Sequence, residues 1–249
     1  RVKEYGAPGE TSHLRRLLHG VIMHGEQYLH PEHRGMLTTY YQSTSGVGMA
    51  IISRREHSAR VGVIGLGTGT LAAYGRRGDA YRFYEINPQV VRLAREKFTY
   101  LADSDAKIEI VPGDARLALE REPPQGYDVL AVDAFSSDAI PLHLITREAL
   151  ALYLRHVKPD GIVAFHVSNR FLDLGPVVAR LALENGAHVA GVYEPGDDAD
   201  ARTQSDWILV SRDAGALEHE EIRAPVEVED RPQWRTWTDD YSNLVQVIK

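Results

Sequence analysis

From Val61 onward, short apolar runs alternate with segments in which apolar residues recur every three or four positions. The short runs, rich in β-branched and aromatic residues, are typical of strands, whereas the longer period indicates helices with one buried face. The predicted strands are residues 61–65, 81–85, 107–111, 127–134, 162–167, 188–193 and 206–211. The predicted helices are residues 68–77, 87–98, 114–122, 147–157 and 175–186.

The order of these elements predicts the fold class. Strands that alternate with helices favour a parallel sheet covered on both faces. The last two strands are joined by the polar loop 194–205 without a helix, which favours an antiparallel hairpin at one edge. The sequence therefore predicts a doubly wound α/β fold with a seven-stranded, mostly parallel sheet. A turn at residues 158–161 is expected before the fifth strand.

Two regions lie outside this core of residues 59–214. Residues 1–58 contain many turn residues and the candidate strands 20–29 and 46–52, which predict a small N-terminal β region. Residues 215–249 end in a segment dense in aromatic and acidic side chains. Because that composition suits a cover over a cationic molecule, the segment is a candidate lid, and the alternative is a tail packed through its tryptophans with its acids in solvent.

Composition narrows the possible functions. The chain has 249 residues, 43% of them hydrophobic, so it can bury a full core. It has no cysteine, which excludes disulfides and thiolate nucleophiles. With 35 acidic and 28 basic residues its net charge is −7, which disfavours nucleic acid and suits a cationic small molecule. No apolar run has the length of a membrane span.

A glycine-rich turn follows the first predicted strand of the core. Gly65, Gly67 and Gly69 allow a sharp bend and a close approach of the backbone to a ligand. A dinucleotide fingerprint would have its third glycine where Thr70 stands. The turn predicts a nucleotide-type cofactor, and an ordinary strand–helix turn is the simpler alternative.

Acidic residues follow the next strands at positions that suit such a cofactor. Glu85 ends the second strand, where a carboxylate can accept both ribose hydroxyls. Asp114 follows the third strand and either accepts from an adenine amino group or caps the next helix. Asp133 ends the fourth strand, and Asp138 follows it closely. Ligands of open α/β sheets bind outside these carboxyl ends, so the four acids predict one site.

Together these motifs resemble a known family. The series "GLGTGT", "YE", "GDAR", "VDAFSSD" and "KPDG" is similar to the class I S-adenosylmethionine-binding fold, and in particular to spermidine synthases, the polyamine aminopropyltransferases. The likeness extends to "LLHGVIMHGEQYL" and "TTYYQSTSGVGMAI" before the core. It is nearest to spermidine synthase-like domains that are fused to a membrane transporter-like half.

The resemblance implies a role for each candidate residue. Decarboxylated S-adenosylmethionine would be the co-substrate and methylthioadenosine its product, with no metal. Asp133 would accept the proton of the attacking amine, and Asp138 would help to hold that amine. Glu85 would bind the ribose and Asp114 the adenine. Further substrate contacts are expected from residues of the N-terminal region and the candidate lid: Tyr40, Tyr41, Gln27, Asp239, Asp240 and Tyr241.

The sequence also departs from the family pattern. Thr68 stands where the family's glycine turn usually has an acid, which anchors the donor's aminopropyl ammonium. Met23 stands where the N-terminal hairpin usually has a glutamine, although Gln27 lies close by. We include Thr68 among the cofactor-binding candidates, because a neutral side chain there also removes repulsion against the carboxylate of intact S-adenosylmethionine.

The histidines of the N-terminal region suggest a metal site only weakly. No carboxylates stand at ligand spacing beside them, so polar turn and pocket-rim roles are favoured. These histidines are His19, His24, His30 and His33.

Three functions follow from the sequence. The first is aminopropyl transfer to a small-molecule amine. The second is a reaction on intact S-adenosylmethionine, by methyl or aminocarboxypropyl transfer or by cleavage. The third is a non-catalytic nucleoside-sensing domain, and an NAD dehydrogenase fits least well. The resemblance further implies a homo-oligomer and a cytoplasmic location, with an attached membrane domain if the chain is part of such a fusion.

Overall fold

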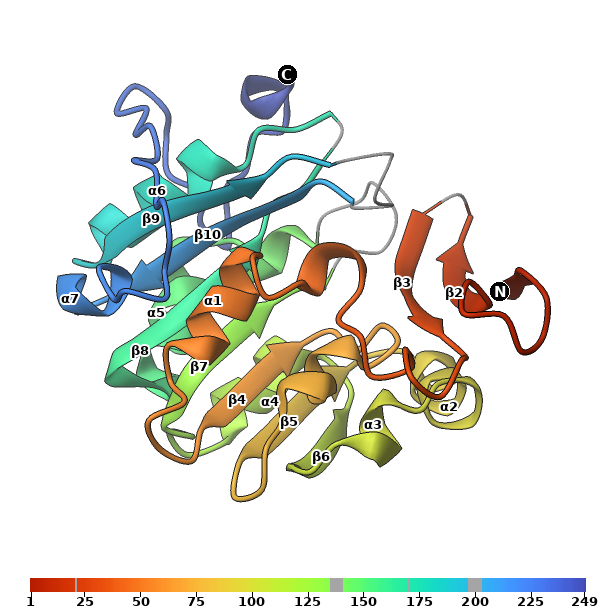
Figure 1. The fold of residues 1–249 in the computed structure, drawn as a ribbon. Coiled ribbons are helices and arrows are strands. Elements are labelled where there is room, and N and C mark those ends of the chain that lie inside the picture. The colour runs from red at the N-terminus through yellow and green to blue at the C-terminus, as the bar shows by residue number, and fades with distance from the viewer. Residues whose placement is uncertain (21, 135–140, 170, 197–202) are drawn as a thin grey trace.

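The computed structural model describes residues 1–20, 22–134, 141–169, 171–196 and 203–249, and its centre is a seven-stranded sheet (Figure 1). The strand order is β6-β5-β4-β7-β8-β10-β9. All neighbours pair in parallel except β10, which is antiparallel to both β8 and β9. The doubly wound fold, the one reversed strand and the hairpin at the edge are thereby confirmed. The strands are β4 (Arg60–Ile64), β5 (Ala80–Glu85), β6 (Lys107–Pro112), β7 (Tyr127–Val132), β8 (Val157–His166), β9 (His188–Glu194) and β10 (Ser205–Ser211).

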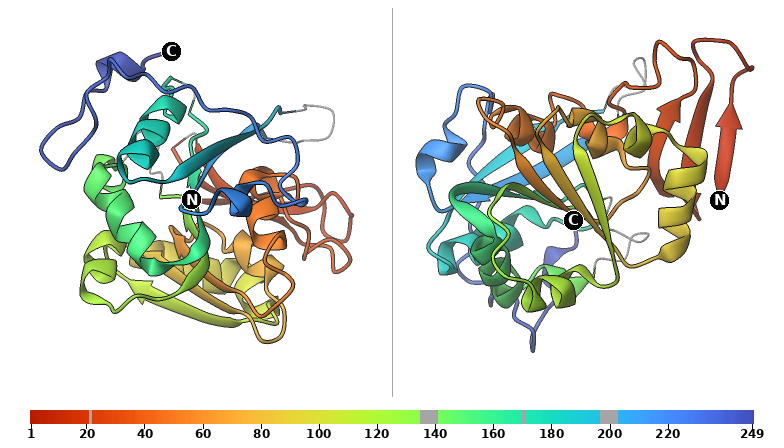
Figure 2. Two further views of the ribbon diagram at one scale, coloured as in Figure 1. Left: turned by 90° about the vertical axis from the view of Figure 1, so that its left-hand side faces the viewer. Right: turned by 90° about the horizontal axis from the view of Figure 1, so that it is seen from below.

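Helices cover both faces of this sheet. They include α1 (Gly46–Ile52), α2 (Pro88–Lys97), α3 (Tyr100–Asp103), α4 (Ala115–Arg121), α5 (Arg147–His156), α6 (Gly175–Glu184) and α7 (Ala214–Leu217). Short 3-10 helices are η1 (Thr39–Tyr41), η2 (Thr70–Tyr74), η3 (Leu142–Leu144) and η4 (Val245–Val247). Figures 1 and 2 show α1 and α7 on one face and α4, α5 and α6 on the other.

The strand side chains alternate between the two faces. In β7, Leu130 and Val132 join the core under α4–α6, whereas Val129 and Ala131 join the core under α1 and α7. Successive residues of a strand point to opposite faces, so a strand covered on both sides is apolar throughout. This is why β4, β7, β8 and β10 were recognisable from short, continuous apolar runs within them.

Three local predictions were wrong. Residues 46–52 form α1 instead of a strand, with the Ser45 side chain accepting the Gly48 N–H at 3.2 Å as an N-cap. A Cβ on Gly46 would meet Trp207 Cβ at 2.5 Å, so the glycine lets this helix pack closely on β10. Residues 68–77 form only η2, which begins after Gly69 in a left-handed conformation. Residues 158–161 belong to β8, whose register against β7 shifts between Tyr127 and Val129.

A second, three-stranded antiparallel sheet is formed by β1 (Val2–Tyr5), β2 (Leu14–His19) and β3 (Ile22–Tyr28). Figures 1 and 2 show it beside α2, at the carboxyl ends of the central parallel strands. Gln27 of β3 ties it to the core, because its amide exchanges two hydrogen bonds with Thr99, at 2.8 and 2.9 Å. Among the described residues, no helix has both the length and the apolarity that crossing a bilayer requires.

Candidate active site

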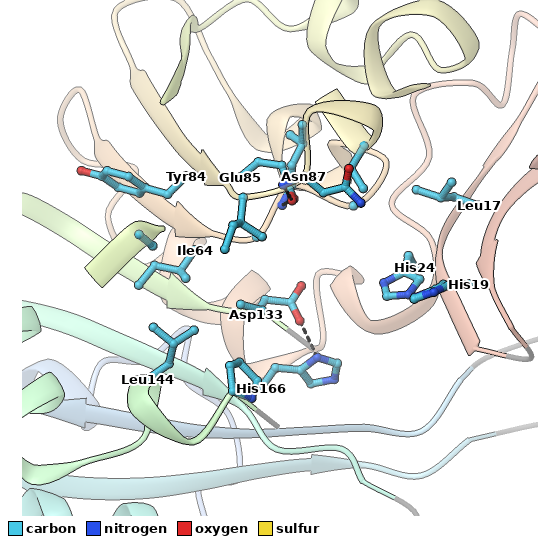
Figure 3. Close-up of a pocket in the computed structure, with 18 of the residues that line it drawn as sticks. Leu17, His19, His24, Ile64, Tyr84, Glu85, Asn87, Asp133, Leu144 and His166 are labelled. Carbon is cyan, nitrogen blue, oxygen red and sulfur yellow. Dashed lines mark hydrogen bonds and ion pairs between the residues drawn. The ribbon is translucent and has the colours of Figure 1, made fainter. Parts of the chain in front are cut away.

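A cleft of about 790 Å³ opens at the carboxyl ends of β4, β5, β7 and β8. Figure 3 shows Glu85 and Asp133 projecting into it from the sheet, with His19 and His24 on the wall that β2 and β3 provide. This is the edge at which open α/β sheets bind their ligands. Glu85, Asp114 and Asp133, which were predicted from separate strand ends, thereby line one cavity.

The glycine turn forms part of the cleft floor. Gly65, Gly67 and Gly69 have φ values of +99°, +54° and +83°, which favour glycine. A Cβ on Gly65 would meet the Asp133 carbonyl oxygen at 2.3 Å, and one on Gly67 would meet the His24 carbonyl oxygen at 2.6 Å. Gly65 and Gly67 line the cleft, whereas Gly69 lies under Leu101 of α3. Two of the three glycines therefore expose their backbone to the cleft.

Thr68 does not line the cleft. Its side chain is 1% exposed and its hydroxyl is 2.8 Å from that of Thr70. A Cβ on Gly25 of β3 would meet the Thr68 Oγ1 at 2.4 Å, so the threonine points at that strand. In this structure Thr68 is a packing residue between the glycine turn and the N-terminal sheet, which differs from the ligand contact predicted for it.

Glu85 is held by the backbone around it. Its Oε2 accepts the Leu66 N–H at 3.0 Å and its Oε1 accepts the Asn87 N–H at 2.8 Å. Burial raises the pKa of Glu85, and these backbone donors oppose the shift without cancelling it. A carboxylate has more acceptor positions than these donors use, and Glu85 lines the cleft, so its oxygens can also accept from ligand hydroxyls.

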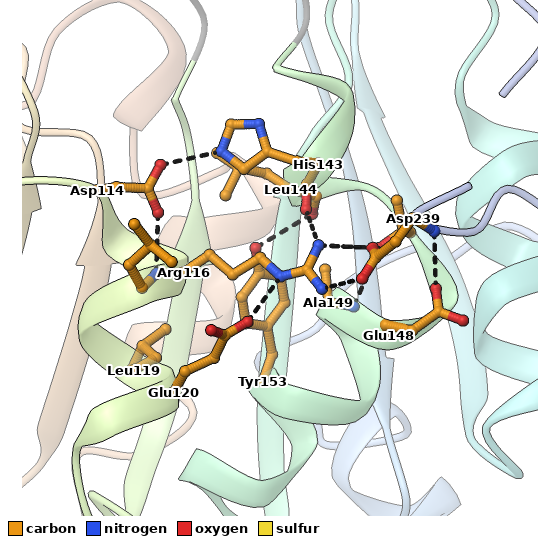
Figure 4. Close-up of polar contacts among 12 residues, drawn as sticks. Asp114, Arg116, Leu119, Glu120, His143, Leu144, Glu148, Ala149, Tyr153 and Asp239 are labelled. Carbon is orange, nitrogen blue, oxygen red and sulfur yellow. Dashed lines mark hydrogen bonds and ion pairs between the residues drawn. The ribbon is translucent and has the colours of Figure 1, made fainter. Parts of the chain in front are cut away.

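Asp114 performs the helix-capping role and also lines the cleft. Its Oδ1 accepts the Leu117 N–H at 2.9 Å, and its Oδ2 lies 3.1 Å from His143 Nε2 (Figure 4). The capping alternative is therefore observed, and the adenine contact stays a prediction. His143, which sequence reasoning missed, reaches this acid from η3.

Asp133 is clamped by two donors from different parts of the chain. Its Oδ2 accepts the Tyr41 hydroxyl at 2.5 Å, and its Oδ1 lies 2.7 Å from His166 Nδ1 (Figure 3). Burial, and then the charge of Asp133, raise the pKa of Tyr41, so its hydroxyl stays a proton donor. The Tyr40 ring lies against His166, at 4.9 Å between centroids, and also lines the cleft.

His166 and Ser168 are the main cleft residues that the sequence reasoning missed. His166 ends β8, and its Nε2 lies 2.9 Å from the Ser168 hydroxyl. The signal was available, since polar residues follow the apolar run 162–165 at the same sheet edge as Asp133. At the strand ends that follow the glycine turn, the prediction considered only acidic residues and so passed over His166 and Ser168.

Other predicted substrate residues lie elsewhere. Gln27 is fully buried, and its amide is used in bonds to Thr99 and to the Arg34 carbonyl. Asp240 and Tyr241 do not line the cleft, and the Tyr241 ring lies under the Arg235 guanidinium at 4.0 Å. Asp138 lies outside the described residues.

The candidate lid is bound to the helices instead of the cleft. Asp239 accepts from both Arg116 of α4, at 2.7 Å for one bond, and the Thr146 hydroxyl at 2.8 Å (Figure 4). Its backbone N–H donates to Glu148 of α5 at 3.1 Å. Trp237, 1% exposed, belongs to the core beneath α5 and α6. The packed-tail alternative is therefore the one observed for these residues.

The N-terminal histidines form two separate ring pairs, with centroids 6.0 Å apart for His19 and His24 and 5.7 Å for His30 and His33. In the described ranges, no three side chains of the metal-ligating types gather as ligands. His24 also lines the cleft, and burial lowers its pKa. Its Nε2 has no hydrogen-bond partner among the described residues.

No family model matches the chain, but two curated proteins are similar to it in sequence. The chain is 25% identical, over 160 residues, to a probable polyamine aminopropyl transferase of Bifidobacterium longum, and 28% identical, over 152 residues, to the polyamine aminopropyltransferase of Vibrio vulnificus. These matches cover 62% and 58% of the chain. They span 33% and 47% of the relatives' own lengths.

Solved structures agree on the fold. A probable spermidine synthase from Corynebacterium glutamicum has a TM-score of 0.64 at 18% identity, covering 84% of this chain and 76% of its own. Spermidine synthase from Thermotoga maritima has a TM-score of 0.59 at 17% identity, covering 92% and 77%. A spermidine synthase in complex with the transition-state analogue AdoDATO has a TM-score of 0.57 at 16% identity, and the match covers 92% of this chain and 76% of that one. The chain is therefore similar in sequence to polyamine aminopropyltransferases and similar in fold to spermidine synthases.

Proposed function

We propose that this chain transfers an aminopropyl group from decarboxylated S-adenosylmethionine to a small-molecule amine. The observation that carries the proposal is the Asp133 carboxylate, clamped by Tyr41 and His166 in a cleft that also contains Glu85 and the glycine turn. The names of the relatives, polyamine aminopropyltransferases, support the same reaction.

The donor's nucleoside would lie along the glycine turn. Gly65 and Gly67 bring bare backbone to the cleft, and the free lone pairs of Glu85 suit two adjacent ribose hydroxyls. Asp114 has one oxygen in a helix cap and the other near His143, so an adenine amino group would share these acceptors. The residues present therefore fit a nucleoside.

Asp133 would act on the acceptor amine. An alkylamine has a pKa of about 10 and is mostly protonated at neutral pH, so its nitrogen must first lose a proton. A carboxylate within hydrogen-bond reach can orient the ammonium and accept that proton. The nitrogen then forms a bond to the propyl carbon as the carbon–sulfur bond breaks. The sulfur keeps the electron pair, and methylthioadenosine leaves as a neutral molecule.

Intact S-adenosylmethionine is the second candidate donor. The observation that favours it is Thr68, which is neutral and turned toward Gly25, so it provides no carboxylate to anchor a donor ammonium. In that case the product would be a methylated or aminocarboxypropylated amine. The two donors are distinguished by the mass added to the acceptor.

The test is mass spectrometry of products from each donor with putrescine and a panel of related amines. We expect methylthioadenosine and an aminopropylated amine from the decarboxylated donor. Asp133→Asn should lower the rate about 100-fold or more, because it removes the proton acceptor. Asp160→Asn, an acid that pairs with Arg54 at the far end of β8, is the matched control and should be fully active. If the wild type forms no methylthioadenosine with any amine, aminopropyl transfer is refuted.

A further inference from the structure

The His166 ring is fixed in its plane by its neighbours. It stacks on Trp207 at 4.6 Å between centroids and 13° between planes, and Tyr40 packs against it at 4.9 Å. Trp207 is itself fully buried, and its Nε1 donates to the Tyr40 carbonyl and the Ser205 hydroxyl at 3.2 and 2.9 Å. The imidazole can therefore turn little, and its Nδ1 edge stays directed at Asp133.

The surrounding hydrogen bonds also indicate where the ring proton lies. The Asp206 backbone N–H donates to the Ser168 hydroxyl oxygen at 2.7 Å, which leaves the hydroxyl proton available for His166 Nε2. At Nδ1 the partner is the Asp133 carboxylate, which can only accept when ionised. An N–H at Nδ1 satisfies both contacts, and the imidazolium form would present the same N–H to Asp133.

We propose that His166 is a positioning residue for the transfer, acting through its Nδ1–H on Asp133. This inference rests on the proposed function. The terminal torsion of an aspartate side chain is broad and soft, so one donor alone does not fix the direction of its free lone pairs. Tyr41 holds one oxygen and His166 the other, from segments more than a hundred residues apart. The lone pairs that remain then point at the amine in a defined direction.

Two substitutions separate this role from simple packing. In His166→Asn the amide nitrogen stands near the position of Nδ1 and keeps a donor to Asp133. In His166→Gln the amide nitrogen stands near Nε2, and the donor to Asp133 is lost. We expect His166→Asn to keep kcat within about fivefold and His166→Gln to lose about 10- to 100-fold, the range for one hydrogen bond to a charged group. The KM for the nucleoside donor should change little in either.

Two control measurements distinguish a loss of positioning from a loss of folding in a variant. Calorimetric binding of methylthioadenosine should be the same in both variants and the wild type, because Glu85 and the glycine turn are untouched. ¹⁵N NMR of the wild-type His166 ring should report a protonated Nδ1, and Asp133→Asn should shift that resonance. This measurement needs no turnover.

The outcomes distinguish the two proposals. An inactive wild type refutes aminopropyl transfer, whatever the NMR shows. An active wild type in which His166→Asn and His166→Gln lose kcat equally refutes the positioning role, as does an unprotonated Nδ1. A selective loss in His166→Gln with a protonated Nδ1 supports it.

Discussion

Thr68→Asp tests whether position 68 faces the donor, as the sequence predicted. If it did, an aspartate there would provide an anchor for the donor's ammonium and favour the decarboxylated donor. In the structure the Thr68 side chain is 1% exposed and lies against Gly25 and Thr70. An aspartate would instead be a buried carboxylate without a cationic partner.

The magnitude follows from that burial. A buried charge left without its partner costs about 3–5 kcal/mol. In a domain of this size each kcal/mol lowers Tm by roughly 2–4 °C, so we expect a drop of roughly 6–20 °C. Since burial raises the pKa of such a carboxyl in the folded state, the loss should be largest at neutral pH and should diminish as the pH falls.

The assay combines calorimetric melting with donor binding. Thr68→Val, which keeps the shape and removes only the hydroxyl bond to Thr70, is the matched control and should cost about 1 kcal/mol. Neither variant should gain affinity for the decarboxylated donor over the intact one. A Thr68→Asp protein that melts within about 2 °C of wild type and prefers the decarboxylated donor by about tenfold or more would refute this account.

The remaining predictions concern the turn, the sheet and the C-terminal segment. Gly65→Ala should abolish donor binding, because its Cβ would meet the Asp133 carbonyl oxygen. Gly126→Ala is the control, since Gly126 also has a positive φ, has open space around its Cβ and does not line the cleft; it should show only the strain of about 1–3 kcal/mol, and equal losses would contradict the clash. Burial opposes ionisation of Asp128, but hydrogen bonds from the Arg60 N–H, Lys158 and His57 outweigh that effect and lower the pKa of Asp128. The stability that ionised Asp128 contributes is therefore present above about pH 4 and is lost as the pH falls through the lowered pKa. Urea unfolding of Asp128→Asn should therefore show a loss of about 2–3 kcal/mol at pH 7 that disappears toward pH 2; a pH-independent loss would argue against this. Asp239→Asn should lower the free energy of unfolding by at most about 1 kcal/mol, since the ion pair of Asp239 with Arg116 is partly exposed, and it should leave the KM for the amine unchanged. A marked rise in that KM would support the lid interpretation instead.

The central sheet and the acids Glu85, Asp114 and Asp133 of the cleft could be predicted from the sequence. Continuous apolar runs mark strands buried on both faces, and helical periodicity marks the elements between them. Residues that follow parallel strands share one edge of a sheet, so Glu85 and Asp133 were predictable as neighbours without knowledge of any contact. Asp114 was predictable in the same way, together with its capping role.

Tertiary structure decided which candidates face the ligand. Thr68 and Gln27 stand at plausible places in the sequence, but their directions are set by Gly25 and Thr99, which belong to other segments. The same is true of residues 46–52, which were predicted as a strand but form α1, where Gly46 packs against Trp207 of β10. His166 joins Asp133 across 33 positions of chain, through a ring held by that tryptophan. Local patterns encode what a segment forms, whereas the direction of one side chain depends on neighbours that only folding brings together.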